Sequence, residues 1–314
     1  LYWRQLVVLS IILLLALLVY GQATGYSFMY DDPLELPRGE GRSLISLLTS
    51  SEGYASFRPL PFILWQAMRW LLGGYDLFWF HLIPVLAHAL NGCLVYLLAA
   101  RLIGRKAAAL AGILFVLYPF SYQAVPWVSA LFHPLVTVFI LSALLLYDRA
   151  RTEVAVGQAF QPAGPSRPWL LLSLLSAALA ILTHELGVVI GPLILAWEAW
   201  LWQQRRPARP SLWPLVYLGM GAAFAIAWLL VPKQKSADLA PLDALGLWQN
   251  AVYFLQGFAY PVTGALGWLS DLTGWQAETL VIPAIALALT FMIVAYVRAK
   301  ALPTLALALW WLGI

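Results

Sequence analysis

Long apolar runs recur along the whole sequence, separated by short polar loops. The hydrocarbon core of a bilayer is about 30 Å thick and a helix rises about 1.5 Å per residue, so roughly 20 apolar residues cross it. Because backbone groups in lipid must be hydrogen-bonded within their own segment, such runs form helices. Only 10% of the residues are charged, whereas soluble domains carry about 25%. The sequence therefore predicts an all-α polytopic integral membrane protein and excludes an ordinary water-soluble fold.

The apolar runs predict about nine spans. Their expected ranges are 5–22, 79–100, 107–120, 126–147, 168–185, 187–203, 211–231 and 277–297, with a ninth beginning near 301. The first is a retained helix rather than a signal peptide, because no small-residue cleavage site follows it. The amphipathic stretch 43–72 and the aromatic stretch 248–268 each fit three placements: a span, a helix in the membrane interface or a re-entrant segment.

The distribution of charge predicts a cytoplasmic N-terminus. With that orientation and both ambiguous stretches outside, 12 of the 18 basic residues face the cytoplasm and 11 of the 14 acidic residues face outward, which follows the positive-inside rule. The outer loops 23–78 and 232–276 then form the side on which we expect a site. We expect residues 1–314 to form a single transmembrane domain, truncated at its ends, because the chain starts without Met and stops within an apolar run.

The formal net charge of +4 reflects this topology, so nucleic acid is not an expected partner. The single cysteine, Cys93, lies in an apolar run and has no intrachain disulfide partner. We interpret it as a packing residue.

Two adjacent carboxylates, Asp31 and Asp32, follow the first helix within roughly ten residues. A pair of acids at the membrane surface is suited to proton transfer or to binding a cation. A solvated turn with an Asp capping a helix fits the same spacing. Nothing in the sequence dictates a metal, and the pair leaves a divalent cation open as the one conceivable cofactor.

Arg58 precedes a stretch rich in Trp, which is typical of a helix lying at headgroup depth. Its guanidinium is suited to contact a phosphate or to reach lipid headgroups.

His81 and His88 are seven residues apart and so project from one face of the second span. Ionisable groups in a membrane are often functional. Packing histidines fit the same pattern, and no His-x-x-x-His spacing supports a metal site.

Three more polar segments follow spans on the same predicted side. The hairpin after the third span holds Gln123 and leads to His133, and the next outer hairpin carries the adjacent pair His184 and Glu185. Charged groups in such apolar hairpins are costly unless they pair or function. Lys233 and Lys235 open the later loop and face either an anionic headgroup or solvent. The convergence of these hairpins predicts a site for a lipid-linked phosphate.

The order of these features resembles the GT-C superfamily of polyprenyl-phosphate-sugar glycosyltransferases, especially its protein O-mannosyltransferase-like branch, which includes transmembrane mannosyltransferases bearing tetratricopeptide repeats. The likeness runs from about residue 1 to 235. It rests on Asp31-Asp32, Arg58-Pro59-Leu60, the stretch 80–91, Tyr118-Pro119 with the stretch 123–127, and His184-Glu185. The resemblance implies a GT-C-like transmembrane bundle with juxtamembrane helices on its outer face.

The resemblance also implies residue roles. An Asp of the first outer loop is the expected base of an inverting transfer, which falls on Asp31 or Asp32, and a polyprenyl-phosphate sugar is the expected donor. The groups that would bind the donor or its phosphate are Arg58, His81, His88, Gln123, His133, His184, Glu185, Lys233 and Lys235. The family has Glu where this chain has Gln123, and Lys-Glu where it has His184-Glu185.

Two other functions compete with an enzyme. A catalytically degenerate GT-C-fold protein would bind lipid or serve as an assembly subunit among other membrane proteins, and its cavity would be blocked. A secondary transporter would need broken helices at the midplane and repeat symmetry, which the sequence does not display.

Overall fold

The computed structural model describes residues 2–51, 54–152, 167–204, 211–232, 270–274 and 290. Contacts divide the chain into one unit formed by Leu1–Lys235 with Ile314, and a second formed by Ser236–Gly313. The stretch 248–268, the two spans expected from 277 onward and most of the loop 232–276 lie outside the described residues. Nearly all the described residues therefore belong to the first unit.

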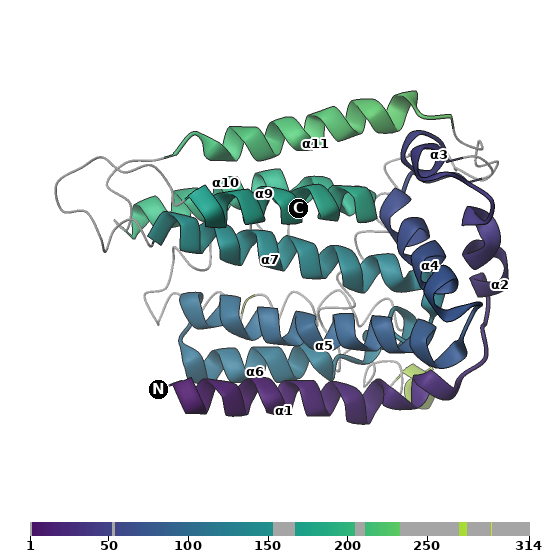
Figure 1. Ribbon diagram of the computed structural model, residues 1–314. Coiled ribbons are helices and arrows are strands. Elements are labelled where there is room, and N and C mark those ends of the chain that lie inside the picture. The colour runs from purple at the N-terminus through teal and green to yellow at the C-terminus, as the bar shows by residue number, and fades with distance from the viewer. Residues whose placement is uncertain are drawn as a thin grey trace. The chain divides into compact units, whose positions relative to one another are not determined.

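The regular structure of this unit is helical throughout its described part, which confirms the all-α membrane class. Its long helices run side by side in Figure 1. They are α1 (Tyr2–Tyr20), α5 (Leu77–Leu102), α6 (Arg105–Val116), α7 (Phe132–Thr152), α9 (Arg167–Thr183), α10 (Ile190–Gln203) and α11 (Trp213–Leu230).

Five segments of the described chain are long and apolar enough to cross a membrane: Trp3–Gly25, Leu77–Leu102, Val128–Thr152, Glu185–Gln203 and Trp213–Leu230. The helix α9 is slightly shorter, with 17 residues. The span expected at 107–120 is shorter still, because α6 has 12 residues and so covers about 18 Å of the roughly 30 Å core. It begins after Gly104, whose φ is 82°, and it ends before Pro119, which opens a separate 3-10 turn.

The ambiguous stretch 43–72 does not span. It forms two helices, α3 (Leu44–Thr49) and α4 (Pro59–Leu72), interrupted over 50–58. Ser43 caps the first by accepting a hydrogen bond from the Ser46 amide at 3.1 Å. The second ends at Gly73, whose φ of 73° is the left-handed conformation that glycine adopts without strain.

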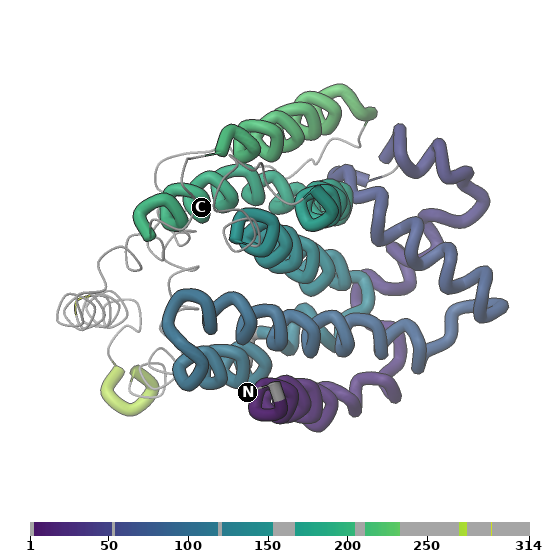
Figure 2. The backbone as a smooth tube through the Cα atoms, turned by 60° about the vertical axis from the view of Figure 1, so that its left-hand side comes forward, coloured from purple at the N-terminus to yellow at the C-terminus, as the bar shows by residue number. Residues whose placement is uncertain are grey.

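These helices lie across one end of the bundle, together with α2 (Asp32–Glu35) and the 3-10 turn η2 (Leu36–Gly39), in both Figure 1 and Figure 2. The turns η3 (Pro119–Gln123), η4 (Val128–Leu131) and η5 (Glu185–Val189) connect bundle helices. We call this end of the unit the α4 end. Trp70 and Leu71 of α4 are 81% and 72% exposed, as expected of a helix that rests in the membrane interface.

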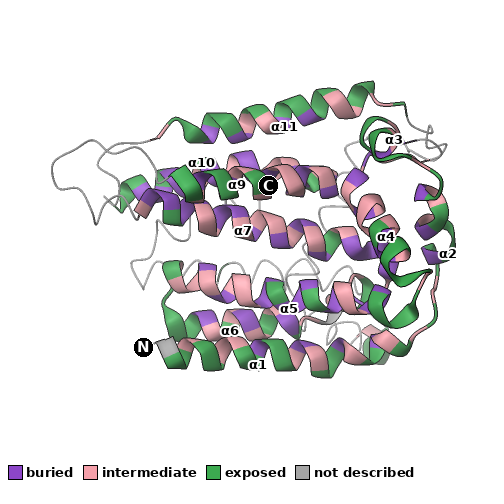
Figure 3. Cartoon of the chain, in the orientation of Figure 1, coloured by how far each residue is buried: buried purple, intermediate pink, exposed green. Residues whose placement is uncertain are grey.

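The inner helices of the bundle are α5, α7 and α10, whose spans are 50%, 56% and 50% buried over their most apolar windows. The spans of α1 and α11 are each 22% buried, and Figure 3 shows the difference as green outer faces on α1 and α11. Lipid would cover those apolar faces. Ile12 of α1 packs where α5 and α6 approach closely: a Cβ on Gly92 would meet it at 2.8 Å, and one on Gly112 at 2.7 Å. Small residues at such crossings let membrane helices pack backbone to backbone.

Candidate functional site

Hydrogen bonds between distant loops assemble the α4 end. The first loop reaches the α6–α7 connection through Asp32 and Ser129. It also reaches η5 through Arg58 and Glu185, and the end of α11 through Ser51 and the Pro232 carbonyl, at 3.0 Å. These hydrogen bonds bring the described parts of the three predicted outer loops together at one end of the bundle.

The two adjacent aspartates have opposite environments. Asp32 is fully buried; one carboxylate oxygen accepts the Ser129 amide at 2.6 Å and the other accepts the Met29 amide at 3.0 Å. Asp31 is exposed and its side chain makes no capping bond at the start of α2. The preceding Tyr30 has a φ of 52°, uncommon for an aromatic residue, and its ring contacts Trp127. Asp32 thus fastens the turn, and the Asp31 side chain faces solvent.

A cluster around Arg58 forms the second part of the site. The Arg58 Nε donates to a Glu185 carboxylate oxygen at 2.8 Å, and the guanidinium carbon lies 4.3 Å from the centroid of the Phe132 ring. The other Glu185 oxygen accepts the Trp228 indole N–H at 3.2 Å. The ion pair with Glu185 holds the Nε edge of the guanidinium, and the stacking on Phe132 holds one of its faces, so the group has a fixed orientation. Its two terminal nitrogens make no hydrogen bond within the described residues.

Two imidazoles stand beside the guanidinium. The rings of His133 and His184 are 5.3 Å apart, and both contact Phe132. The His184 Nδ1 accepts the Leu186 amide at 3.0 Å, so that nitrogen carries no proton. Burial and the Arg58 charge lower the pKa of His184 to about 4. The imidazole is therefore neutral at pH 7, and the fixed positive charge of this cluster comes from Arg58.

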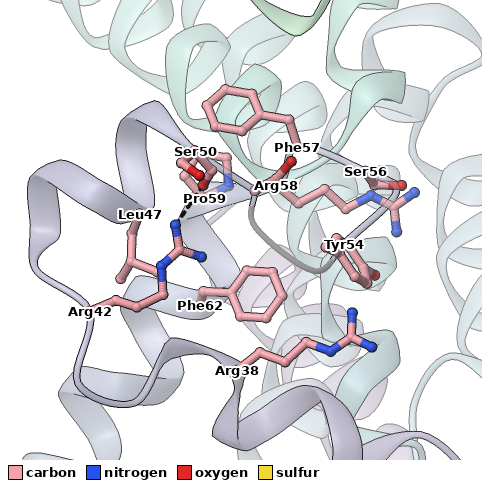
Figure 4. Close-up of a pocket in the computed structure, with 11 residues that line it drawn as sticks. Arg38, Arg42, Leu47, Ser50, Tyr54, Ser56, Phe57, Arg58, Pro59 and Phe62 are labelled. Atoms are coloured by element: carbon pink, nitrogen blue, oxygen red, sulfur yellow. Dashed lines mark hydrogen bonds between the residues drawn. The ribbon is translucent and has the colours of Figure 1, made fainter. Parts of the chain in front are cut away.

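A hollow that opens to solvent lies next to the cluster, and its lining residues fall between Arg38 and Phe62 of the first loop. Figure 4 shows Arg38, Tyr54 and Arg58 around it, with Arg42 turned toward Ser50. The guanidinium of Arg42 donates to the Ser46 and Ser50 carbonyls at 2.9 and 2.8 Å and so closes the C-terminus of α3.

Three residues beside this hollow were not predicted from the sequence: Glu35, Arg38 and Tyr54. Arg38 lies 3.5 Å from Glu35 and stacks 5.0 Å from the centroid of Tyr54. Burial raises the pKa of Glu35 and of Tyr54. The signal for two of them was present in the sequence, because Glu35 follows Asp31 by one helical turn and Arg38 follows by nearly another.

The remaining predicted residues lie elsewhere. His81 donates from Nδ1 to the Leu77 carbonyl at 2.8 Å and stacks on Phe28. His88 donates from Nε2 to the Val116 carbonyl at 3.2 Å, between α5 and α6. Both are buried, and these contacts fit the packing interpretation. Gln123 is exposed and donates to the Tyr122 hydroxyl. Lys233 and Lys235 lie outside the described residues.

The described residues hold no group of three His, Cys, Asp or Glu side chains arranged to bind a metal ion. A divalent cation bound by the adjacent aspartates therefore stays a hypothesis, and this part of the chain shows no set of ligands for it.

Gly187 sets the close approach of η5 to α9 and thereby the position of Glu185. A Cβ at this residue would lie 2.4 Å from the Ala180 carbonyl carbon and oxygen, which cannot move aside as a side chain can. We expect Gly187→Ala to lower the free energy of unfolding by about 1–3 kcal/mol. Gly219→Ala is the matched control, because a Cβ there meets nothing within 4 Å. Equal thermal midpoints of the two variants in detergent would contradict this expectation.

No family model matches the chain, and no solved structure matches it significantly. The chain is similar to human protein O-mannosyl-transferase TMTC4, with 26% identity over 216 residues that cover 60% of this chain and 28% of the relative. It is also similar to mouse protein O-mannosyl-transferase TMTC1, with 28% identity over 153 residues, 48% of this chain and 16% of the relative. The chain thus spans less than a third of the length of these relatives.

Proposed function

We propose that this protein is an inverting glycosyltransferase that moves a sugar from a polyprenyl phosphate to a hydroxyl acceptor. The observation that carries the proposal is the guanidinium of Arg58, which Glu185 and Phe132 hold at Nε and on one face while its terminal nitrogens stay available. Such a preoriented fork is suited to the oxygens of a phosphate. The distant relatives named as mannosyl-transferases support the same class of reaction.

In the proposed reaction the acceptor oxygen attacks C1 of the sugar from the face opposite the phosphate. Its proton passes to the Asp31 carboxylate, and the bond between C1 and the phosphate oxygen breaks. The polyprenyl phosphate leaves with that electron pair, and its new negative charge lies against Arg58. The configuration at C1 inverts because a single displacement occurs. The exposed His133 beside Arg58 is placed to donate a further hydrogen bond to the phosphate.

We further propose that the α4 end faces the extracytoplasmic side and that the N-terminus is cytoplasmic. The basic residues Arg101, Arg105, Arg149, Arg151 and Arg167 stand at the opposite ends of their helices, which supports this orientation through the positive-inside rule. The proposed donor therefore enters from the outer leaflet, with its isoprenoid tail among the membrane lipids.

The test is transfer of a radiolabelled sugar from its polyprenyl phosphate by the purified protein in lipid. We expect Arg58→Ala to lower kcat by about 10²- to 10³-fold, the loss that accompanies removal of one preorganised donor. Arg58→Lys should recover only part of that loss, because a point charge cannot replace the fork. The matched control is Arg69→Ala on α4, the helix that Arg58 precedes; the Arg69 guanidinium pairs with Glu40 at 3.3 Å. Unchanged turnover in Arg58→Ala, or no transfer by the native chain, would overturn the proposal.

A further inference from the structure

The wall of the hollow opposite Arg58 carries polar groups that the proposed reaction does not use. These groups are Glu35, Arg38 and Tyr54, and Arg38 contacts the other two. Its Nη1 lies 3.5 Å from a Glu35 oxygen, and its guanidinium carbon lies 5.0 Å from the centroid of the Tyr54 ring. Arg38, Tyr54 and Arg58 all line the same hollow, as Figure 4 shows. A phenol and a guanidinium thus line the hollow that Arg58 also lines, and a carboxylate pairs with that guanidinium.

Two of these groups each have one polar atom that makes no hydrogen bond among the described residues. The Glu35 side chain is 12% exposed, and its Oε2 is buried without a hydrogen-bond partner among the described residues. A buried carboxylate oxygen without a donor is costly, so its presence points to a hydrogen bond made with something else. The Tyr54 hydroxyl also makes no hydrogen bond within the described residues, while its ring is fixed edge-on against Phe62, 5.6 Å away.

We infer that Glu35, Arg38 and Tyr54 form the subsite that recognises the hydroxyl groups of the transferred sugar. The inference rests on the proposed function and adds to it the residues that select the sugar. Glu35 accepts hydrogen bonds from sugar hydroxyls, Arg38 donates to them, and the Tyr54 hydroxyl does both.

The lining of the hollow also offers aromatic surface to a sugar. The rings of Tyr54 and Phe62 in its lining offer apolar faces for the C–H groups of a sugar, beside the polar groups that line the same hollow. Such a pocket distinguishes sugars by where their hydroxyls point.

The experiment measures two binding constants for the full chain in lipid nanodiscs. The probes are undecaprenyl phosphate and its mannosyl ester, which share the phosphate and differ by one sugar. We expect Glu35→Gln and Tyr54→Phe each to weaken binding of the mannosyl ester by about tenfold, as loss of one charge-assisted hydrogen bond does. Binding of undecaprenyl phosphate should change less than about twofold, because Arg58 remains. Glu40→Gln is the matched control: it removes a carboxylate from the same loop that pairs with Arg69 instead.

The outcomes separate the two proposals. Equal losses for both probes would show that Glu35 and Tyr54 only support the fold, and would overturn the sugar subsite. Unchanged binding of both probes in the two variants would overturn it as well. If the native chain bound neither probe and Arg58→Ala changed nothing, the proposed function itself would fail. A fluorescence thermal midpoint for each variant shows that it is folded before its binding is compared.

Discussion

Replacing Asp31 by Asn is expected to reduce sugar transfer by about 10²- to 10⁴-fold while leaving thermal unfolding unchanged. An amide cannot take the proton of the acceptor hydroxyl, which is the role we propose for this carboxylate. The side chain is exposed and makes no capping bond in the turn, so the fold loses nothing when its charge is removed. The measurement is the initial rate of transfer from a radiolabelled polyprenyl-phosphate sugar, paired with a thermal melt.

Asp32 is the control, and its replacement should change the stability of the fold rather than the chemical step. Asn at position 32 would place an amide group where two backbone N–H groups now donate to the Asp32 carboxylate. We expect Asp32→Asn to lower the free energy of unfolding by about 1–3 kcal/mol, because a buried donor is left without an acceptor. Activity should fall with the folded fraction. Full turnover in Asp31→Asn, combined with inactivity of a well-folded Asp32→Asn, would move the base to Asp32.

Removing the Arg151 guanidinium is expected to cost about 3–5 kcal/mol of stability, because it leaves a buried carboxylate uncompensated. Arg151 of α7 pairs with Glu198 of α10 at 2.7 Å, and both side chains are less than a tenth exposed. Glu198 also accepts the Tyr147 hydroxyl and the Ser211 amide just before α11. One carboxylate therefore fastens three helices at the end of the bundle farthest from the site.

The variant is Arg151→Met, and the measurement is the thermal midpoint in detergent. The matched control is Arg105→Met, an exposed arginine at the start of α6, which should change stability by less than about 0.5 kcal/mol. The double variant Arg151→Met with Glu198→Leu should recover much of the loss, because it removes the unpaired charge as well. A single variant as stable as the native chain would show that Glu198 is solvated and not buried.

The hydrophobic pattern predicted most of the bundle because the requirement behind it is local. The expected ranges 79–100 and 126–147 match α5 and the segment Val128–Thr152 to within a few residues. A backbone in lipid has no alternative to the helix, whatever its neighbours are. The prediction was less accurate at 107–120, where Pro119 ends the helix early, and at 43–72, where the amphipathic pattern fitted three placements and the structure has two short helices.

The sequence predicted which loops carry the candidate site better than it predicted which residues of those loops come together. Arg58 and Glu185 were both candidates, and the structure joins them across 127 positions of the chain. The histidines were harder to interpret. A histidine in an apolar span gives the same sequence pattern whether its ring binds a ligand or donates to a backbone carbonyl, as His81 and His88 do. Glu35 and Tyr54 were not singled out in the sequence: Tyr54 lines the hollow only through the fold, and Glu35 is related to the hollow by its pairing with Arg38.

Composition and apolar run length alone determined that this chain is a helical membrane protein, since both reflect the cost of placing backbone and charge in hydrocarbon. Tertiary structure alone decided which of two identical, adjacent carboxylates meets solvent. Asp31 and Asp32 have the same chemistry and nearly the same sequence neighbours, but only Asp32 is buried and accepts a hydrogen bond from the Ser129 amide, 97 residues away. Burial is a property of the contacts between segments, so a single segment cannot reveal it.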